Sequence, residues 1–266
     1  MPENLRTERD GDVLRITFTR PDRRNAFDAA LIAELAEAFV GVGRARAVVL
    51  AGDGPSFSAG ADIDWMRSSV DLSYEENVAD ANALRAMLEA IDGCPAPVVA
   101  RVQGHALGGG AGLVAAADIA IAEPDAVFAF SEVKLGIIPA VISPFALARI
   151  GPGNARRYFV TGERFDAETA LRIGLVHVLA DDLDAEVERF VGELLRSGPE
   201  ATRAAKRLAR ERPATGDELA RLAAGMRSGT EGQEGLRAFL EKRPARGPDR
   251  STWGVYGQRP DAQQSM

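Results

Sequence analysis

Two glycine-bearing segments of the sequence could present backbone N–H groups to a ligand. The first is FSAGADI at residues 57–63 and the second is GHALGGGAG at residues 104–112, and each follows a short apolar run. A small residue in a turn lets a ligand approach the backbone, and the start of a helix leaves N–H groups without partners. Two such turns after adjacent parallel strands could direct one N–H each at a single oxygen atom. This geometry is an oxyanion hole, in which each donor contributes about 2.7–4 kcal/mol of transition-state stabilisation. Either turn alone is more simply explained by a tight chain reversal or close helix packing.

Other kinds of site fit the sequence less well. The spacing Gly110-x-Gly112-x-x-Ala115 matches a permissive dinucleotide fingerprint, but no acidic residue obviously ends the next strand where a ribose would need it. The chain has two histidines and one cysteine, Cys94, which excludes a cysteine-based zinc site and a multi-histidine metal site. We therefore expect no bound metal.

The elements that would position the two turns alternate between strands and helices. Apolar or alternating patterns predict strands at residues 13–19, 47–51, 97–102, 118–122 and 126–130. Asp28 could cap a first amphipathic helix, and Ser73 with Glu76 forms a capping box before a long one. This alternation predicts an α/β layered fold. From about residue 154 the pattern is mostly helical, and beyond Arg243 it loses its periodicity.

The composition restricts the partners and the compartment. The chain has 266 residues, of which 46% are hydrophobic and 27% are charged, so a core of useful size needs no disulfide or metal. A net charge of −7 argues against nucleic acid or an anionic membrane as the main partner. The first ten residues lack the apolar core of a signal peptide, and no uncharged apolar run could span a bilayer. We expect a cytoplasmic protein.

Several strings in a fixed order make the sequence similar to a known family. They are RPDRRNAFD at 20–28, FSAGADI at 57–63, the glycine-rich segment ending in AADI at 116–119, SEVKLGIIP at 131–139, TGERFDA at 161–167 and AFLEKR at 238–243. Together they resemble the enoyl-CoA hydratase/isomerase (crotonase) superfamily over nearly the whole chain. The resemblance implies an α/β fold, a crotonase-like spiral of repeated ββα units with a C-terminal helical trimerisation region. We expect the α/β core at 1–200, the helical region at 201–245 and a flexible tail at 246–266.

The resemblance also implies the residues that bind an acyl-CoA thioester. The two N–H donors to the thioester carbonyl fall on Ala61 and Gly109. Coenzyme A would lie along the first turn, against Arg24, Ala26, Ala59, Asp62 and Ile63. Lys242 or Arg243 would reach the coenzyme A phosphates of a neighbouring subunit in a homotrimer or hexamer (a dimer of trimers). Many members have a lysine where this chain has Asp64, which weakens that phosphate contact. Coenzyme A is part of the substrate, so no separate cofactor is expected.

The catalytic carboxylates depart from the family pattern. Hydratases of this family use two glutamates; the second matches Glu132, and the first falls on Gly112, which has no side chain. Glu132 alone could activate water and then return the proton to carbon, which would contribute about 10²–10⁴-fold to the rate. It could instead move a proton between carbons, as in Δ3,Δ2-enoyl-CoA isomerases. A third alternative is a catalytically weak acyl-CoA-binding protein.

Three further strings resemble bacterial 3-methylglutaconyl-CoA hydratase-like proteins of leucine and isoprenoid catabolism. They are ADIDWMR at 61–67, SYEEN at 73–77 and PAVISPF at 139–145. The resemblance implies a lyase that adds water to an α,β-unsaturated acyl-CoA with a branched or carboxylated acyl group. A carboxylated acyl group would require a cation of the protein near its far end.

Overall fold

The computed structural model describes residues 4–211, 215–247 and 252–254. The chain divides into two compact units, Met1–Phe190 and Val191–Met266. The first unit alternates strands with helices, and the second is mainly helical. This confirms the predicted mixed α/β chain that ends in helices. Among the described residues, no helix is both long and apolar enough to cross a bilayer.

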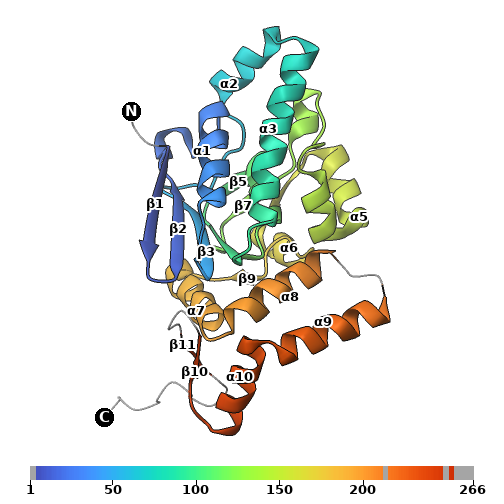
Figure 1. The fold of residues 1–266 in the computed structure, drawn as a ribbon. Coiled ribbons are helices and arrows are strands. Elements are labelled where there is room, and N and C mark those ends of the chain that lie inside the picture. The colour runs from blue at the N-terminus through green and yellow to red at the C-terminus, as the bar shows by residue number, and fades with distance from the viewer. Residues whose placement is uncertain (1–3, 212–214, 248–251, 255–266) are drawn as a thin grey trace, which may run out of the picture. The chain divides into compact units, whose positions relative to one another are not determined.

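A six-stranded sheet organises the first unit (Figure 1). Its order is β1 (Leu5–Asp10), β2 (Val13–Phe18), β3 (Ala47–Gly52), β4 (Val98–Val102), β6 (Ile119–Ala122) and β9 (Val178–Leu179). β1 is antiparallel to β2, and every later pair is parallel. The apolar run of β3 is buried almost throughout, as is typical of a parallel strand covered on both faces. Four of the five predicted strands are thereby confirmed.

The N-terminal strand β1 has no counterpart among the predicted strands. Only Leu5 of its six residues is buried, and the other five are exposed polar or charged residues. Its register is set by pairing with β2, from Leu5 opposite Phe18 to Asp10 opposite Val13. Charged side chains are common on edge strands because they discourage further pairing. The strand therefore depends on its neighbour and has little hydrophobic pattern of its own.

A second sheet lies after a sharp turn at Gly104. It contains β5 (His105–Leu107), β7 (Val127–Ala129) and β8 (Arg164–Asp166), with β5 parallel to β7 and β8 antiparallel to it. Gly104 has φ +56, and a Cβ there would overlap the carbonyl oxygen of Pro55. Glycine is required where a positive φ and a close backbone approach coincide. β7 confirms the predicted strand at 126–130.

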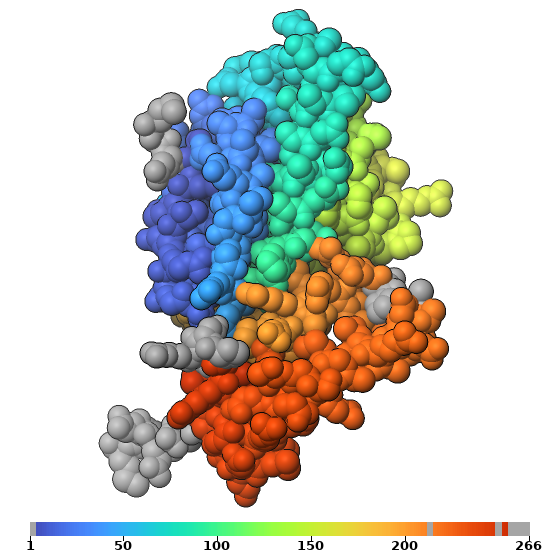
Figure 2. Space-filling view, viewed as in Figure 1, coloured from blue at the N-terminus to red at the C-terminus, as the bar shows by residue number. Residues whose placement is uncertain are grey.

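Two long helices of the first unit pack side by side. Asp28 caps α1 (Ala29–Val40) by accepting a hydrogen bond of 3.0 Å from the N–H of Leu31. The predicted capping box begins α3 (Tyr74–Asp92), where Ser73 and Glu76 bond each other's backbone N–H groups. Figure 1 shows both helices, and Figure 2 shows their blue and green surfaces adjoining. The remaining helices of this unit are short or follow the sites described below: η1 (Pro21–Arg23), α2 (Ile63–Ser68), η2 (Ser69–Asp71), α4 (Gly109–Ala116), η3 (Glu132–Leu135), α5 (Ser143–Thr161) and α6 (Ala167–Arg172).

The second unit follows α7 (Leu183–Leu195), which crosses the boundary. It contains α8 (Pro199–Glu211), α9 (Gly216–Ser228), α10 (Thr230–Leu240), β10 (Ala245–Arg246) and β11 (Thr252–Trp253). The carboxylate of Glu231 caps α8 by accepting the N–H groups of Glu200 and Ala201, both at 2.8 Å. Of the predicted flexible tail at 246–266, residues 248–251 and 255–266 lie outside the described residues. In the described part, β11 pairs with β10 and Trp253 is buried.

Candidate active site

The two glycine-bearing segments run side by side in the first unit. Ser58 and Ala106 form a parallel bridge between them. The N–H of Ser58 donates to the carbonyl of His105 at 2.9 Å, and the N–H of Leu107 donates to the carbonyl of Ser58 at 3.1 Å. The first glycine-bearing segment therefore runs along β5, which belongs to the second glycine-bearing segment. This is the neighbouring arrangement that two converging donors require.

Gly60 allows the closest approach between these segments. Its φ is +88, and a Cβ there would lie 2.5 Å from the carbonyl oxygen of Leu107 and 3.5 Å from the backbone nitrogen of Gly109. Any larger residue would push the two segments apart. The structure therefore brings Ala61, the next residue along the chain, close to Gly109.

The N–H groups of Ala61 and Gly109 have no hydrogen-bond acceptor among the described residues. Gly109 is the first residue of α4, and the preceding Gly108 provides no side chain to cap the helix. The first N–H groups of a helix have no partner within it and lie at its partially positive end. Both amides are therefore available to an electron-rich atom from outside the chain.

Glu132 places a carboxylate beside the second turn. It begins η3, shortly after β7, and β7 is tied to the turn because the N–H of Gly108 donates to the carbonyl of Ala129 at 2.8 Å. A Cβ on Gly108 would lie 3.5 Å from Oε1 of Glu132. Its Oε2 is buried without a hydrogen-bond partner among the described residues. Burial raises the pKa of Glu132 above its ordinary value, although a bond from its own backbone N–H opposes this.

The position of the first family glutamate, which is Gly112 in this chain, has no room for a side chain. Gly112 is buried in α4, and a Cβ there would lie 2.5 Å from Cγ2 of Ile142, the residue before α5. Ile142 is itself buried, so its branched side chain occupies the space that a carboxylate would enter. The glycine at position 112 thus faces a large residue that directly precedes α5.

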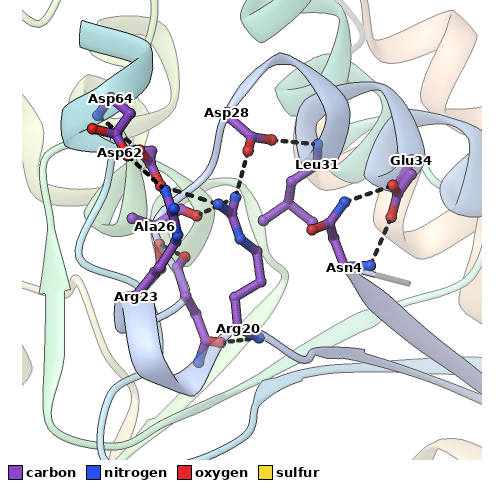
Figure 3. A network of polar contacts seen from close by, with 11 residues as sticks. Asn4, Arg20, Arg23, Ala26, Asp28, Leu31, Glu34, Asp62 and Asp64 are labelled. Carbon is purple, nitrogen blue, oxygen red and sulfur yellow. Dashed lines mark hydrogen bonds and ion pairs between the residues drawn. The ribbon is translucent and has the colours of Figure 1, made fainter. Parts of the chain in front are cut away.

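A network of arginines and aspartates holds the first turn in place (Figure 3). Arg20 donates to the carbonyl of Ala26 at 2.9 Å and to Asp62 at 3.0 Å, and it pairs with Asp28 at 2.9 Å. Arg23 reaches Asp62 at 2.9 Å. The side chains of Arg20 and Asp62 are only 11% and 4% exposed. Water screens such a pair weakly, so it fixes the loop more firmly than a surface ion pair would.

The ionised form of Asp62 is favoured by its partners. Burial alone would raise the pKa of Asp62, but hydrogen bonds from Arg23 and from the N–H of Asp64, with the charges of Arg23 and Arg20, outweigh it. The pKa therefore lies below its ordinary value. Asp62 also caps α2 through the N–H of Asp64 at 2.9 Å. The side chain of Asp62 therefore faces the protein, regardless of which atoms of Asp62 a ligand contacts.

The other residues expected to contact coenzyme A lie along the same turn. Ala59 donates its N–H to the carbonyl of Arg24 at 2.9 Å, and the Arg24 side chain is exposed. Ala26 is buried, and its carbonyl is the acceptor used by Arg20. Ile63 begins α2 with its side chain in solvent, at 63% exposure. An exposed arginine and an exposed isoleucine therefore flank a turn of small residues.

Lys242 belongs to the second unit, where it is exposed and has φ +53. Its neighbour Arg243 is engaged: it pairs with Glu234 and Glu241, each at 2.6 Å. The hydrogen bond from Arg243 and its charge lower the pKa of Glu234 to about 2. Of the two cations expected to reach phosphate groups, Lys242 is the one without an ion pair among the described residues.

Three residues that shape the turn have no role in the sequence-based assignment, although all lie in the RPDRRNAFD string. Arg20 forms the network described above. Asn25 is fully buried with φ +53, and its side-chain amide donates to the carbonyls of Asp53 and Ser56. Phe27 pairs with Ala61 through a parallel bridge. The signal present in the sequence was a polar residue close to an apolar one within this turn string.

No group of three or more histidine, cysteine, aspartate or glutamate side chains is placed to hold a metal ion in the described part of the chain. His177 is occupied by its neighbours: Nδ1 accepts the N–H of Ala120 at 3.0 Å, and Nε2 faces Arg149 at 2.9 Å. Its pKa is lowered, first by burial and then by the charge of Arg149.

Comparison with known proteins gives one consistent result. The model of the enoyl-CoA hydratase/isomerase family matches residues 8–249. The crotonyl-CoA hydratase of Syntrophomonas wolfei is 35% identical over 255 residues, which cover 91% of this chain and 97% of that protein. The cyclohexa-1,5-dienecarbonyl-CoA hydratase of Thauera aromatica is 33% identical over a match that covers 92% of this chain and 96% of that protein. The crystal structure of an enoyl-CoA hydratase from Shewanella pealeana matches with 41% sequence identity and a TM-score of 0.86. The match covers 91% of this chain and 94% of that chain. The matched residues include both turns and Glu132.

Proposed function

The chain belongs to the enoyl-CoA hydratase/isomerase family and is an enzyme of the hydratase type, and we propose that it hydrates a branched or carboxylated enoyl-CoA with one carboxylate, Glu132. The main support is the pair of unbonded amides, Ala61 and Gly109, on neighbouring segments beside an unpartnered carboxylate. A thioester carbonyl oxygen can accept hydrogen bonds from two such donors, and a water molecule can hydrogen-bond to the carboxylate of Glu132.

The amides act on the charge that develops during the reaction. When water adds to the β-carbon of the enoyl thioester, the double-bond electrons move toward the carbonyl oxygen and an enolate forms. Donors fixed before the reaction stabilise that oxyanion more than the neutral carbonyl, so they lower the barrier. Their supports are rigid, because Gly109 begins a buried helix and Ala61 follows a turn held by Arg20 and Asp62.

Glu132 moves the proton. In the ionised form it takes a proton from water while the water oxygen bonds to the β-carbon. The protonated Glu132 then returns that proton to the α-carbon, and the enolate electrons form the new C–H bond. The oxygen and both hydrogens of the water end in the product, and Glu132 returns to its ionised form. The raised pKa of Glu132 suits this double task, because a general acid–base works best with a pKa near the operating pH.

The acyl group is the finer part of the proposal. It rests on the strings at 61–67, 73–77 and 139–145 and on the replacement of one family glutamate by Gly112 against Ile142. The test measures the loss of ultraviolet absorbance of the enoyl thioester with crotonyl-CoA and 3-methylglutaconyl-CoA. We expect a larger kcat/KM for 3-methylglutaconyl-CoA. A larger value for crotonyl-CoA would contradict the proposed acyl group, and no turnover of any enoyl-CoA would contradict the hydratase.

Isomerisation is a second candidate, because it needs one carboxylate and Gly112 cannot supply another. Glu132 would remove a proton from the carbon next to the thioester of a 3-enoyl-CoA and return it two carbons further along. Incubation of 3-enoyl-CoA with the enzyme would then produce the conjugated 2-enoyl thioester before any hydrated product. Hydration without this interconversion would exclude it.

We also propose that Lys242 contacts the phosphates of coenzyme A across subunits of a trimer. Its exposure and lack of an ion pair among the described residues support the contact. Lys242→Ala should raise KM for the CoA thioester and leave that for the matching pantetheine thioester, which lacks those phosphates, unchanged. An equal change for both would contradict the contact, and a monomer in sedimentation would contradict the trimer.

A further inference from the structure

We propose that Phe27 is a positioning residue that sets the separation of the two oxyanion-hole donors, an inference that rests on the proposed function. Phe27 contacts both donor segments, one through its backbone and the other through its ring. No donated hydrogen bond to substrate is required of it. Its effect on catalysis would pass entirely through the amides of Ala61 and Gly109.

The backbone of Phe27 holds the peptide groups on either side of Ala61. Its N–H donates to the carbonyl of Gly60 at 2.8 Å, and its carbonyl accepts the N–H of Asp62 at 2.9 Å. In a parallel bridge the backbone groups of successive residues point to opposite sides. Because the groups of Gly60 and Asp62 face Phe27, the N–H of Ala61 is directed away from it. This direction agrees with the lack of an acceptor for Ala61 within the described residues.

The ring of Phe27 abuts the other donor. A Cβ added to Gly109 would overlap Cζ of Phe27 and lie 3.1 Å from both Cε atoms. The ring therefore lies against the Cα of Gly109, at the first residue of α4. Phe27 is 2% exposed, so its ring has no solvent space into which it could turn. The ring acts as a spacer of fixed length between the first turn and the start of α4.

Phe27 is itself anchored on both sides along the chain. Arg20 binds the carbonyl of Ala26 and the carboxylate of Asp28, the two residues that flank it. Figure 3 shows Arg20 between these groups and Asp62. Asp28 also caps α1. Because Phe27 is fixed in this way, the groups in contact with it are held at a defined position. This distinguishes Phe27 from a core residue that only fills space.

The test uses Phe27→Leu, which removes the far edge of the ring, and Phe39→Leu as the control. Phe39 is a similarly buried phenylalanine, 3% exposed, on α1. Each protein is mixed with cinnamoyl-CoA, whose absorbance moves to longer wavelength when its conjugated thioester carbonyl is polarised by hydrogen bonds. We expect Phe27→Leu to lose at least about half of the wild-type wavelength shift and about 10-fold or more of kcat, within the range for a weakened oxyanion donor. The Kd for the thioester should change little.

The control separates positioning from packing. Phe39→Leu should lower Tm as much as Phe27→Leu but keep the wavelength shift and kcat. A Phe27→Leu enzyme whose shift and kcat match those of Phe39→Leu would overturn the inference while leaving the proposed function intact. Absence of both shift and turnover in the wild type would overturn the proposed function, and the inference with it.

A second substitution tests the contact from the other side. Gly109 has no positive φ and keeps its N–H when changed to alanine. In the wild type, Gly109→Ala should push the amide away from the ring and reduce both kcat and the wavelength shift. In the Phe27→Leu background the added methyl should occupy the vacated space and recover part of the shift. Equal losses from Gly109→Ala in both backgrounds would contradict the proposed spacer.

Discussion

A methyl group added at position 112 tests whether Ile142 occupies the space of the missing carboxylate. A Cβ on Gly112 would lie 2.5 Å from Cγ2 and 3.0 Å from Cβ of Ile142, whereas carbon atoms in contact lie about 3.5–4.0 Å apart. Overpacking of this kind costs about 1–3 kcal/mol, and exchanging glycine for alanine in a helix recovers about 1 kcal/mol. We expect Gly112→Ala to lower the free energy of unfolding by up to about 2 kcal/mol.

The same change should cost less when Ile142 is shortened. Ile142→Ala removes Cγ2 and leaves the 3.0 Å approach to Cβ, which a shift of a few tenths of an ångström relieves, so Gly112→Ala should be close to neutral in that background. Ile142→Val keeps both branches at Cβ and is the matched control, in which Gly112→Ala should stay unfavourable. The assay is urea unfolding of each pair, supported by Tm, where 1 kcal/mol corresponds to roughly 2–4 °C. The same effect of Gly112→Ala in all three backgrounds would refute the steric explanation.

Four further expectations concern the acid and the turn. Glu132→Gln should lower kcat by about 10²–10⁴-fold with little change in thioester binding, and retained turnover would mean that another group moves the proton. In the wild type, kcat/KM should fall as the pH falls through the raised pKa of Glu132, because the ionised form must accept a proton from water; a fall only in the range of an ordinary glutamate would contradict this. A raised carboxyl pKa also means that the stability contribution of Glu132 is complete below its ordinary pKa of about 4.5 and is lost as the pH rises through the folded value. Thermal unfolding should therefore show Glu132→Gln to be more stable than the wild type at neutral pH but not at low pH. Arg20→Gln should lower the free energy of unfolding by about 1.5–3 kcal/mol in urea, against less than about 1 kcal/mol for the exposed Arg67→Gln; equal effects would show that burial of the Arg20 network adds nothing.

Much of the fold could be predicted because its patterns are local. The buried run of β3, the Asp28 cap and the Ser73 capping box each depend on a few neighbouring residues, and each is confirmed. The crotonase-like fold, implied by strings spread along the chain, is confirmed by the family match and by the similarity to the Shewanella pealeana structure. The three-residue strands β5 and β8 lack enough residues for a pattern, because their pairing to β7 defines them.

Sequence reasoning proposed the donors and the acid of the candidate site, but it did not propose the residues that support them. Glycine spacing pointed to the turns, and the SEVKLG frame pointed to Glu132. The contact of Ile142 with Gly112 joins residues 30 positions apart, and that of Phe27 with Gly109 joins residues 82 positions apart. No periodicity or motif encodes such contacts, since they arise only when separate elements pack.

The candidate site differs from its surroundings because several of its polar groups lack hydrogen-bond partners. Asp62 and Asn25 are buried, the side chain of Arg20 is 11% exposed, and the three bond one another, Arg23 or nearby backbone groups. A few residues away, the amides of Ala61 and Gly109 and Oε2 of Glu132 have no partner among the described residues. Oε2 of Glu132 is buried, and a buried polar atom left unpaired costs about 1–3 kcal/mol, which a group bound there would offset. Two donors that need one acceptor, beside an acid that can give or take a proton, are complementary to a thioester oxygen and a water molecule. The substrate therefore completes the hydrogen bonding that the chain leaves open, and the binding of an enoyl thioester should itself raise Tm.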